Sequence, residues 1–280
     1  MQRAESYAAL APLLSAQLRR GVVTNCFLSA EDYQRELASG LFYEQGEGFL
    51  LLFRQRQGHL LLNFYLHPDA VLRLPALRVP VVTELACREK DREAMRRAQE
   101  ALCALGFAEL FRRLRRTRAA CPAPDIAEAA DAASFEAVQT FLLAQFDPLT
   151  GCIPPDEDLR QAVDAGQMLC LTDAAGIAGL LHYAPGRAQC EIRHLAVRAD
   201  CRGRGCAGRL LRMLEAKTGG QKCAVWTRAG NAPAEHVYEK NRFQPDGWSS
   251  VVLRLGERSF LHYEKADHGD PDGNLPGRRL

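Results

Sequence analysis

Apolar residues recur with two different periods in the first 120 residues, and each period predicts one kind of element. A spacing of three to four residues predicts helices at about 1–20 and 91–105. Ser29 can cap a further helix, which is expected to end at Gly40. Runs rich in apolar and β-branched residues predict strands at 49–54, 59–66, 80–87 and 107–118. The first two of these strands flank a short polar turn and therefore predict a hairpin.

A similar pattern returns after a short stretch of small residues and prolines at 121–125, which predicts a linker. Helical spacing predicts helices at 131–146 and 155–166. An antiparallel meander is expected next, with strands at 167–172, 177–183 and 189–197. Further along, the sequence predicts a glycine-rich turn with a helix, a short strand at 222–226 and a helix from about Pro233.

The chain is organised around the stretch 191–214. It begins as a strand in which Ile192, His194 and Ala196 are expected on one face and the intervening residues on the other. A glycine-rich turn follows at 202–207, and the helix after it repeats apolar side chains at a spacing of three to four. A strand, a glycine turn and a helix in this order suit the binding of an anion.

The anion would bind at the start of the helix, where backbone N–H groups are unpaired and the helix dipole favours negative charge. Gly203 and Gly205 allow close approach to the backbone, and Arg202 and Arg204 add positive charge. A nucleotide P-loop is excluded because its Gly-Lys-Ser/Thr ending is absent. The glycines at 203, 205 and 208 match the spacing of a dinucleotide fingerprint, but no β-α-β series with a ribose-binding acid about 20 residues on is evident.

The run Arg-x-x-Gly-x-Ala at 202–207 resembles the acetyl-CoA pyrophosphate loop of the GNAT superfamily of N-acetyltransferases. Asn231, Tyr238 and Phe243 follow at the spacing of that family, while Asn241 stands where glycine is usual. Asparagine tolerates the left-handed conformation that a helix end needs, so this departure is compatible with the resemblance. The resemblance implies an α+β fold with a mixed, mostly antiparallel sheet flanked by helices.

The first half resembles a reduced copy of the second, because its helix also ends in a glycine and a phenylalanine, Gly106 and Phe107. Its segment 67–78, where a phosphate turn would fall, contains no glycine, and so the first half is not expected to bind acetyl-CoA. The sequence thus predicts two GNAT-like domains in tandem, and an unrelated α+β domain is the alternative for the first half. The predicted parts are a degenerate domain at 1–120, a linker at 121–125, a catalytic domain at 126–265 and a disordered tail at 266–280.

Composition adds limits on function and location. The chain has 280 residues, of which 47% are hydrophobic, and this fraction predicts a packed core. Its net charge of +2 does not indicate a nucleic-acid binder, and the basic run Arg112–Arg118 is expected to be a solvated strand face or a charged sheet edge. Ten scattered cysteines without a Cys-x-x-Cys pair predict reduced thiols, no metal site and a cytoplasmic location. No apolar run reaches about 20 residues, and no signal segment is evident, so no membrane span is expected.

The resemblance implies acetyl-CoA as co-substrate and suggests the residues that hold it. Its diphosphate is expected on the backbone N–H groups of Arg202, Gly203, Arg204, Gly205, Cys206 and Ala207. The pantetheine arm is expected to pair with the strand residues Leu195, Ala196 and Val197, with the Val197 N–H meeting the thioester carbonyl. Asn231 is expected to bind the cofactor or to cap its helix.

Direct transfer of an acetyl group needs a proton donor for the leaving thiolate and a proton acceptor for the amine. Tyr238 is the expected donor, as in the resembled family. Glu191 and His194 are the two candidates for the base. Glu191 lies roughly 20 Å along the strand from Val197 and would act through water, whereas His194 is nearer and has a suitable ordinary pKa. Alternation puts these two side chains on opposite faces unless a bulge intervenes, and a salt-bridged glutamate and a core histidine are the alternatives.

The sequence therefore predicts an N-acetyltransferase that moves an acetyl group to a primary amine, on a small molecule or a peptide, without a covalent intermediate. A non-catalytic acyl-CoA-binding or interaction module is the alternative, and it would keep the 202–207 turn without using Tyr238. Nucleic-acid binding through the basic run would have to weaken steeply with salt. A homodimer is compatible with the sequence.

Overall fold

The computed structural model describes residues 1–124 and 130–256, so the predicted tail at 266–280 lies outside the described residues. The helices of the first half are α1 (Tyr7–Gln17), α2 (Ala30–Ser39) and α3 (Arg92–Ala104). Its strands are β1 (Gln2–Arg3), β2 (Val23–Thr24), β3 (Leu41–Gly46), β4 (Phe49–Arg56), β5 (His59–Leu66), β6 (Val81–Arg88) and β7 (Ala108–Arg118).

The second half repeats the plan of the first and adds a helix. Its helices are α4 (Phe135–Gln145), α5 (Asp156–Asp164), α6 (Cys206–Lys217) and α7 (Ala232–Lys240). Its strands are β8 (Met168–Asp173), β9 (Gly176–Ala184), β10 (Cys190–Val197), β11 (Cys223–Arg228) and β12 (Gln244–Leu255). The predicted hairpin, meander and main helices are confirmed.

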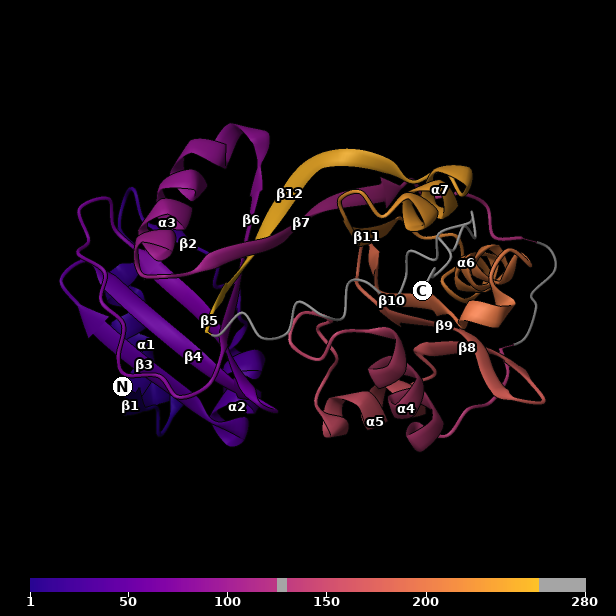
Figure 1. Ribbon diagram of the computed structural model, residues 1–280, viewed down its shortest axis with the longest axis horizontal. Coiled ribbons are helices and arrows are strands. Elements are labelled where there is room, and N and C mark those ends of the chain that lie inside the picture. The colour runs from indigo at the N-terminus through magenta and orange to yellow at the C-terminus, as the bar shows by residue number, and fades with distance from the viewer. Residues whose placement is uncertain (125–129, 257–280) are drawn as a thin grey trace, which may run out of the picture.

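The described strands form one 12-stranded sheet, which runs through both halves of the chain (Figure 1). The order is β1-β3-β4-β5-β6-β12-β7-β11-β10-β9-β8, with β2 paired to β5 beside this path. Most pairs are antiparallel, and the parallel pairs are β5 with β6 and β10 with β11. The predicted α+β class and mixed, mostly antiparallel sheet are confirmed.

The last strands of the two halves are exchanged at the centre of the sheet. The last strand of the second half, β12, lies between β6 and β7, and the last strand of the first half, β7, lies between β12 and β11. Figure 1 shows these two long strands running side by side from one half to the other. The interpretation of the basic run as a sheet edge is therefore wrong, because β7 is an interior strand.

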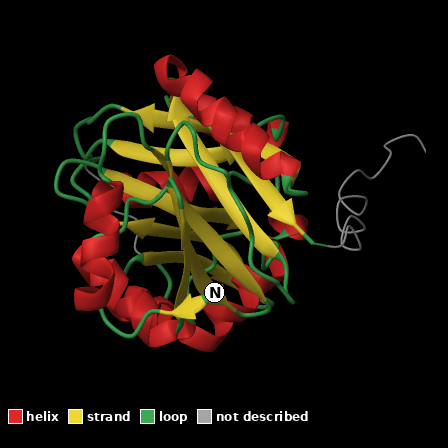
Figure 2. Ribbon diagram, turned by 90° about the vertical axis from the view of Figure 1, so that its left-hand side faces the viewer, coloured by secondary structure: helices red, strands yellow, loops and turns green. Residues whose placement is uncertain are grey.

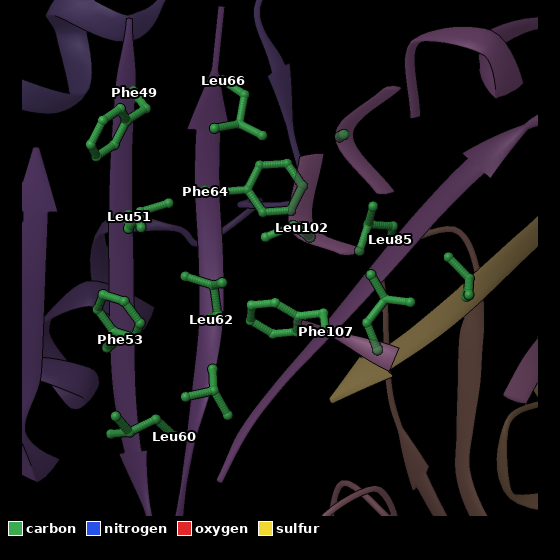
Figure 3. Packing of buried hydrophobic residues seen from close by; sticks show 14 residues of the cluster. Phe49, Leu51, Phe53, Leu60, Leu62, Phe64, Leu66, Leu85, Leu102 and Phe107 are labelled. Carbon is green, nitrogen blue, oxygen red and sulfur yellow. The ribbon is translucent and has the colours of Figure 1, made fainter. Parts of the chain in front are cut away.

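Helices cover both faces of the sheet, as Figure 2 shows for the N-terminal side. In β4 the alternation places Leu51 and Phe53 in a core with α3, and Leu50 and Leu52 in a second core with α1 and α2. Figure 3 shows the first of these cores, in which Phe64 of β5 lies near Leu102 of α3 and near Phe107. In the second half, one core contains α6 and α7 and the other contains α4 and α5.

One predicted helix begins later than expected, and one strand is missing from the prediction. The helix expected from Asp131 begins at Phe135, because Ser134 caps it by accepting the Ala137 N–H at 3.3 Å. Asp131 instead bridges to Cys170 and accepts the Thr172 N–H at 2.6 Å. Strand β3 was not predicted at all, although it pairs along its whole length with β4.

Candidate active site

The central feature of the second half is an opening between β10 and β11. The two parallel strands pair over three residues only, from Cys190 with Cys223 to Ile192 with Val225, and then separate. Strand β10 continues to Val197 along β9. Because Arg198 donates its backbone N–H to Ala178 of β9 at 2.9 Å, alternation turns the N–H of Val197 away from β9 and towards the opening. The edge formed by Leu195, Ala196 and Val197 thus faces the opening, where the Val197 carbonyl accepts from Arg202 Nε at 3.2 Å and the Val197 N–H can meet an extended ligand.

The predicted anion turn lies between the end of β10 and the start of α6. Gly203 and Gly205 have positive φ of 74° and 80°, and no heavy atom lies within 4 Å of a Cβ built on either. Gly205 is the N-cap of α6, whose first turn holds no acidic side chain, so the helix dipole is not offset there by a carboxylate. Arg202 and Arg204 are exposed beside the turn, and Cys206 and Ala207 begin the helix. The geometry suits a phosphate group.

A β-bulge in β10 changes which side chains share a face. The register with β9 shifts between Ile192 and His194, so that Arg193 is the extra residue. Ile192 belongs to the core with α6, whereas Ala196 packs against the core with α4. The predicted common face of Ile192 and His194 is therefore wrong. Glu191 and His194 instead share the face that α4 and α5 cover, which we name the acceptor face.

Glu191 is half-buried on the acceptor face, and its carboxylate lies 3.4 Å from the guanidinium of Arg193. His194 is 2% exposed and lies at hydrogen-bond distance from two partners, which are Gly151 O at 2.8 Å from Nε2 and His182 Nδ1 at 3.0 Å from Nδ1. Burial, followed by the nearby charges of Arg193 and Arg113, lowers the pKa of His194 to about 4, although the bond to Gly151 opposes this shift. The imidazole is neutral near pH 7, and both of its nitrogens are occupied.

Tyr238 and Asn231 lie on α7, beyond the end of β11. Tyr238 is 5% exposed, shares a core with Ile192 and Val225, and meets the Phe243 ring edge-on at 5.3 Å. Burial, reinforced by the Cys223 thiol, raises its pKa above the ordinary range, so the phenol keeps its proton. Asn231 caps α7, because its side-chain oxygen accepts the Ala234 N–H at 3.2 Å.

The first half has a matching opening between β5 and β6, which pair only at Leu60 with Val81 and Leu61 with Val82. This opening is filled by the chain itself. Asn25 accepts the Phe64 N–H at 2.8 Å, and its amide nitrogen lies 3.2 Å from Leu62 O, 2.9 Å from Thr83 Oγ1 and 3.1 Å from Glu84 O. Strand β2, just before Asn25, pairs with the end of β5. Sequence reasoning missed Asn25, since only the folded sheet brings it to this edge.

The arginines of β7 are paired within the protein. Arg112 lies beside Glu109, Arg113 beside Glu84, Arg115 beside Asp246, Arg116 beside Glu239 and Arg118 beside Glu215. Arg115 also lies 5.0 Å from the Trp248 ring centroid and 5.9 Å from that of Trp226. Apart from Arg112, whose side chain is exposed, these arginines therefore pack the centre of the sheet and do not form a solvated face.

The structure also sets limits on other kinds of site. Within residues 1–124 and 130–256, the helices are all too short or too polar to cross a membrane. In the same ranges, three or more His, Cys, Asp or Glu side chains do not gather anywhere as potential metal ligands. A cavity of about 660 Å³ lies at the outer edge of the sheet beside β8, and its lining includes none of the predicted site residues.

Comparison with known proteins finds a family model that matches the part of the chain containing this site. The model of the acetyltransferase (GNAT) family matches residues 136–243, which include both the turn at 202–207 and Tyr238. A GCN5-related N-acetyltransferase from Sphaerobacter thermophilus shares 17% identity, with 82% of this chain and 86% of that chain covered and a TM-score of 0.51. A GNAT-family acetyltransferase from Colwellia psychrerythraea shares 15% identity, with 91% and 99% covered and a TM-score of 0.52.

These two structures cover 82% and 91% of the chain, which shows that both of its halves take part in a fold of this type. The resemblance drawn from the sequence is confirmed for the second half, and the similarity of the first half is confirmed at the level of fold. A comparison with curated proteins gives no match.

Proposed function

Because the model of the acetyltransferase (GNAT) family matches residues 136–243, we propose that this chain transfers an acetyl group from acetyl-CoA directly to a primary amine. The observation that carries the proposal is the opening between β10 and β11 beside a glycine turn in which, among the described residues, a Cβ on Gly203 or Gly205 would meet no atom within 4 Å. The acceptor amine belongs to a small molecule or a peptide, and no covalent enzyme intermediate is involved.

We propose that the backbone N–H groups of 203–207 bind the diphosphate, with Arg202 and Arg204 adding charge. The pantetheine arm contains amide groups and would pair with the edge of β10 that faces the opening. The filled opening in the first half supports this assignment, because there an amide group from Asn25 pairs with the equivalent strand β5. Asn231 contributes by ordering the start of α7.

The chemistry follows from these positions. The amine nitrogen attacks the thioester carbon, the Val197 N–H stabilises the charge on the carbonyl oxygen, and the carbon–sulfur bond breaks. The proton of Tyr238 goes to the leaving thiolate, and the proton lost by the amine goes to a base. Its raised pKa keeps Tyr238 protonated until the thiolate forms.

We propose Glu191 as the base, acting through water. The half-buried carboxylate lies on the acceptor face, beside the opening. His194 is the weaker candidate, because its two nitrogens are engaged and its lowered pKa makes it a poor proton acceptor at neutral pH. The bulge at Arg193 supports Glu191 further, since it shortens the path along the strand to Val197.

We also propose that residues 1–120 act as a unit without cofactor, joined by 121–125 to a catalytic unit at 126–265. The filled opening at Asn25 and the absence of glycine from 67–78 support this division of roles. A cytoplasmic location is supported by the ten cysteines, all of which are free thiols.

The test is a screen of small amines, polyamines, aminoglycosides and peptide N-termini for thiol release from acetyl-CoA. Tyr238→Phe should lower kcat about a hundredfold with acetyl-CoA affinity unchanged. Tyr183→Phe is the matched control, because Tyr183 is equally buried in the same core and should retain full activity. Acetyl-CoA binding without turnover of any amine would favour the non-catalytic module, and equal activity of both variants would remove Tyr238 from the mechanism.

A further inference from the structure

The segment 147–153 links α4 to α5 and lies on the acceptor face. Asp147 shapes its turn, because one carboxylate oxygen accepts the N–H groups of Leu149 at 3.0 Å and Thr150 at 2.9 Å, together with the Thr150 hydroxyl at 2.9 Å. The Gly151 N–H donates to Asp147 O at 2.7 Å, and Cys152 has a positive φ of 56°. The segment thus has a defined internal conformation, with one residue in a region that is costly for a side chain.

Two successive carbonyl groups of this segment are held from opposite halves of the protein. The Thr150 carbonyl accepts from Arg113 Nη2 at 2.6 Å, and Arg113 lies on β7 of the first half. The Gly151 carbonyl pairs with His194 Nε2 at 2.8 Å, and His194 lies on β10 of the second half. The exchange of strands makes this possible, because it brings β7 next to β11 and thus within reach of the acceptor face.

The histidine contact is fixed by a second histidine. Because the Gly151 oxygen can only accept, His194 carries its proton on Nε2, and its Nδ1 accepts from the Nδ1–H of His182 at 3.0 Å. The two rings are stacked with planes 10° apart, and Phe146 meets the His194 ring edge-on at 4.8 Å. His182 thereby selects the tautomer of His194 that can hold the segment.

The arginine contact is fixed by a carboxylate between the two halves. Arg113 is ion-paired with Glu84 of β6, and Glu84 also accepts from the Ser250 hydroxyl of β12 at 2.5 Å. The Arg113 side chain is 16% exposed, so the pair is largely shielded from water. The planar guanidinium can serve the Glu84 carboxylate and the Thr150 carbonyl at the same time.

The location of the segment connects it to the reaction. His194 lies just beyond the last paired residue of β10 and three residues, roughly 10 Å, before Val197. The segment therefore covers the acceptor face next to the proposed base and the edge proposed for the thioester. A shift of this wall would move the acceptor without disturbing the glycine turn, which lies at the far end of β10.

We propose that Arg113 and His194 are positioning residues, which hold the 147–153 segment as one wall of the amine site, so that the first half of the chain helps to set acceptor affinity. The inference rests on the proposed function, because it assigns the acceptor face to the amine. It gives the first half a role in a reaction for which that half binds no cofactor.

The experiment compares Arg113→Ala and His194→Ala with Arg97→Ala, an exposed arginine of α3 that serves as a matched control. Removing either contact should raise the KM for the amine about tenfold while acetyl-CoA affinity is unchanged. Arg113→Lys and His194→Gln should recover part of the loss, because each keeps a donor near its carbonyl. Unchanged acceptor KM in both alanine variants, or equal losses of acceptor and acetyl-CoA affinity, would overturn the proposal.

Amide hydrogen exchange separates this proposal from the proposed function. Residues 147–153 should exchange faster in Arg113→Ala and His194→Ala than in Arg97→Ala, while the hydrogen-bonded N–H groups of α6 from Arg209 onward keep their protection. This readout needs no substrate, so it tests the positioning role even if no amine in the panel is acetylated. Wild-type exchange of 147–153 in both variants would overturn the positioning role by itself.

Discussion

The side-chain oxygen of Asn25 accepts the backbone N–H of Phe64 at 2.8 Å, at the point where β5 and β6 separate. Its amide nitrogen contacts acceptors on both strands. The first half therefore carries, within its own sequence, a polar group that occupies its opening, while among the described residues the corresponding edge of β10 is contacted at Val197 O by Arg202. Two copies of one fold differ here in whether the opening is filled from within.

Asn25→Ala should destabilise the chain by about 3 kcal/mol, because the Phe64 N–H and the Leu62 and Glu84 carbonyls would lose a partner inside the structure. Chemical denaturation measures this change. Asn241→Ala, which removes one hydrogen bond to Val237, should lower the free energy of unfolding by less.

The filled opening also predicts how many cofactor molecules bind. Calorimetric titration of the wild type should give one acetyl-CoA per chain. A stoichiometry of two would show that the first opening also accepts the cofactor.

The histidine pair predicts a specific dependence of stability on pH. The folded pKa of His194 is about 4, below the ordinary 6.5, so the unfolded chain binds more protons between these values. The stability contributed by the neutral ring is present above about pH 6.5 and is lost as the pH falls towards 4. Glutamine takes up no proton, so the free energy of unfolding of His194→Gln should not fall in this way. The difference in unfolding free energy between the wild type and the variant should therefore narrow by about 1.4 kcal/mol per pH unit below 6.5.

Denaturant titrations of both proteins at several pH values between 4 and 7.5 measure this difference. His59 and His182, whose pKa values are lowered mainly by burial, are present in both proteins, so their contributions to the free energy of unfolding largely cancel. A constant difference between wild type and variant across this range would show that His194 takes up protons equally well in the folded and unfolded states.

The pairing of Arg118 with Glu215 predicts a stability effect far from the site. Arg118 is 3% exposed, faces the Phe243 ring at 5.1 Å, and has only Glu215 of α6 as its described ionic partner. Glu215→Ala would leave this charge buried and should cost about 3 kcal/mol. Glu93→Ala, which removes a fully exposed glutamate of α3, should have little effect on the denaturation midpoint. Equal midpoints for the two variants would contradict an electrostatic role for the basic run inside the sheet.

Local signals in the sequence predicted much of this fold. Apolar runs around a polar turn predicted the 49–66 hairpin. The glycines at 203 and 205 predicted a turn that needs positive φ. The second helix began where its cap predicted, with Ser29 and Asp32 forming a complete capping box. These features depend on residues that are close together in the chain.

The missing features depend on contacts between distant residues. The bulge at Arg193 is set by pairing with β9, and it decided that Glu191 and His194 share a face. The exchange of β7 and β12 joins residues more than 100 positions apart, as in the ion pair of Arg115 with Asp246. The acidic partners of the basic run lie mostly on other elements, so the run by itself carries no sign of them.

The most direct test is calorimetric titration of acetyl-CoA into the wild type, Gly203→Asp and Gly58→Asp. Both glycines have φ near 75° and open space at the Cβ position, so the two substitutions introduce the same strain and the same charge. Wild type and Gly58→Asp should bind one acetyl-CoA with similar affinity, and Gly203→Asp should bind at least tenfold more weakly, because its carboxylate repels the diphosphate. Equal affinity of the two variants, or no binding to the wild type, would contradict the placement of the coenzyme at the start of α6.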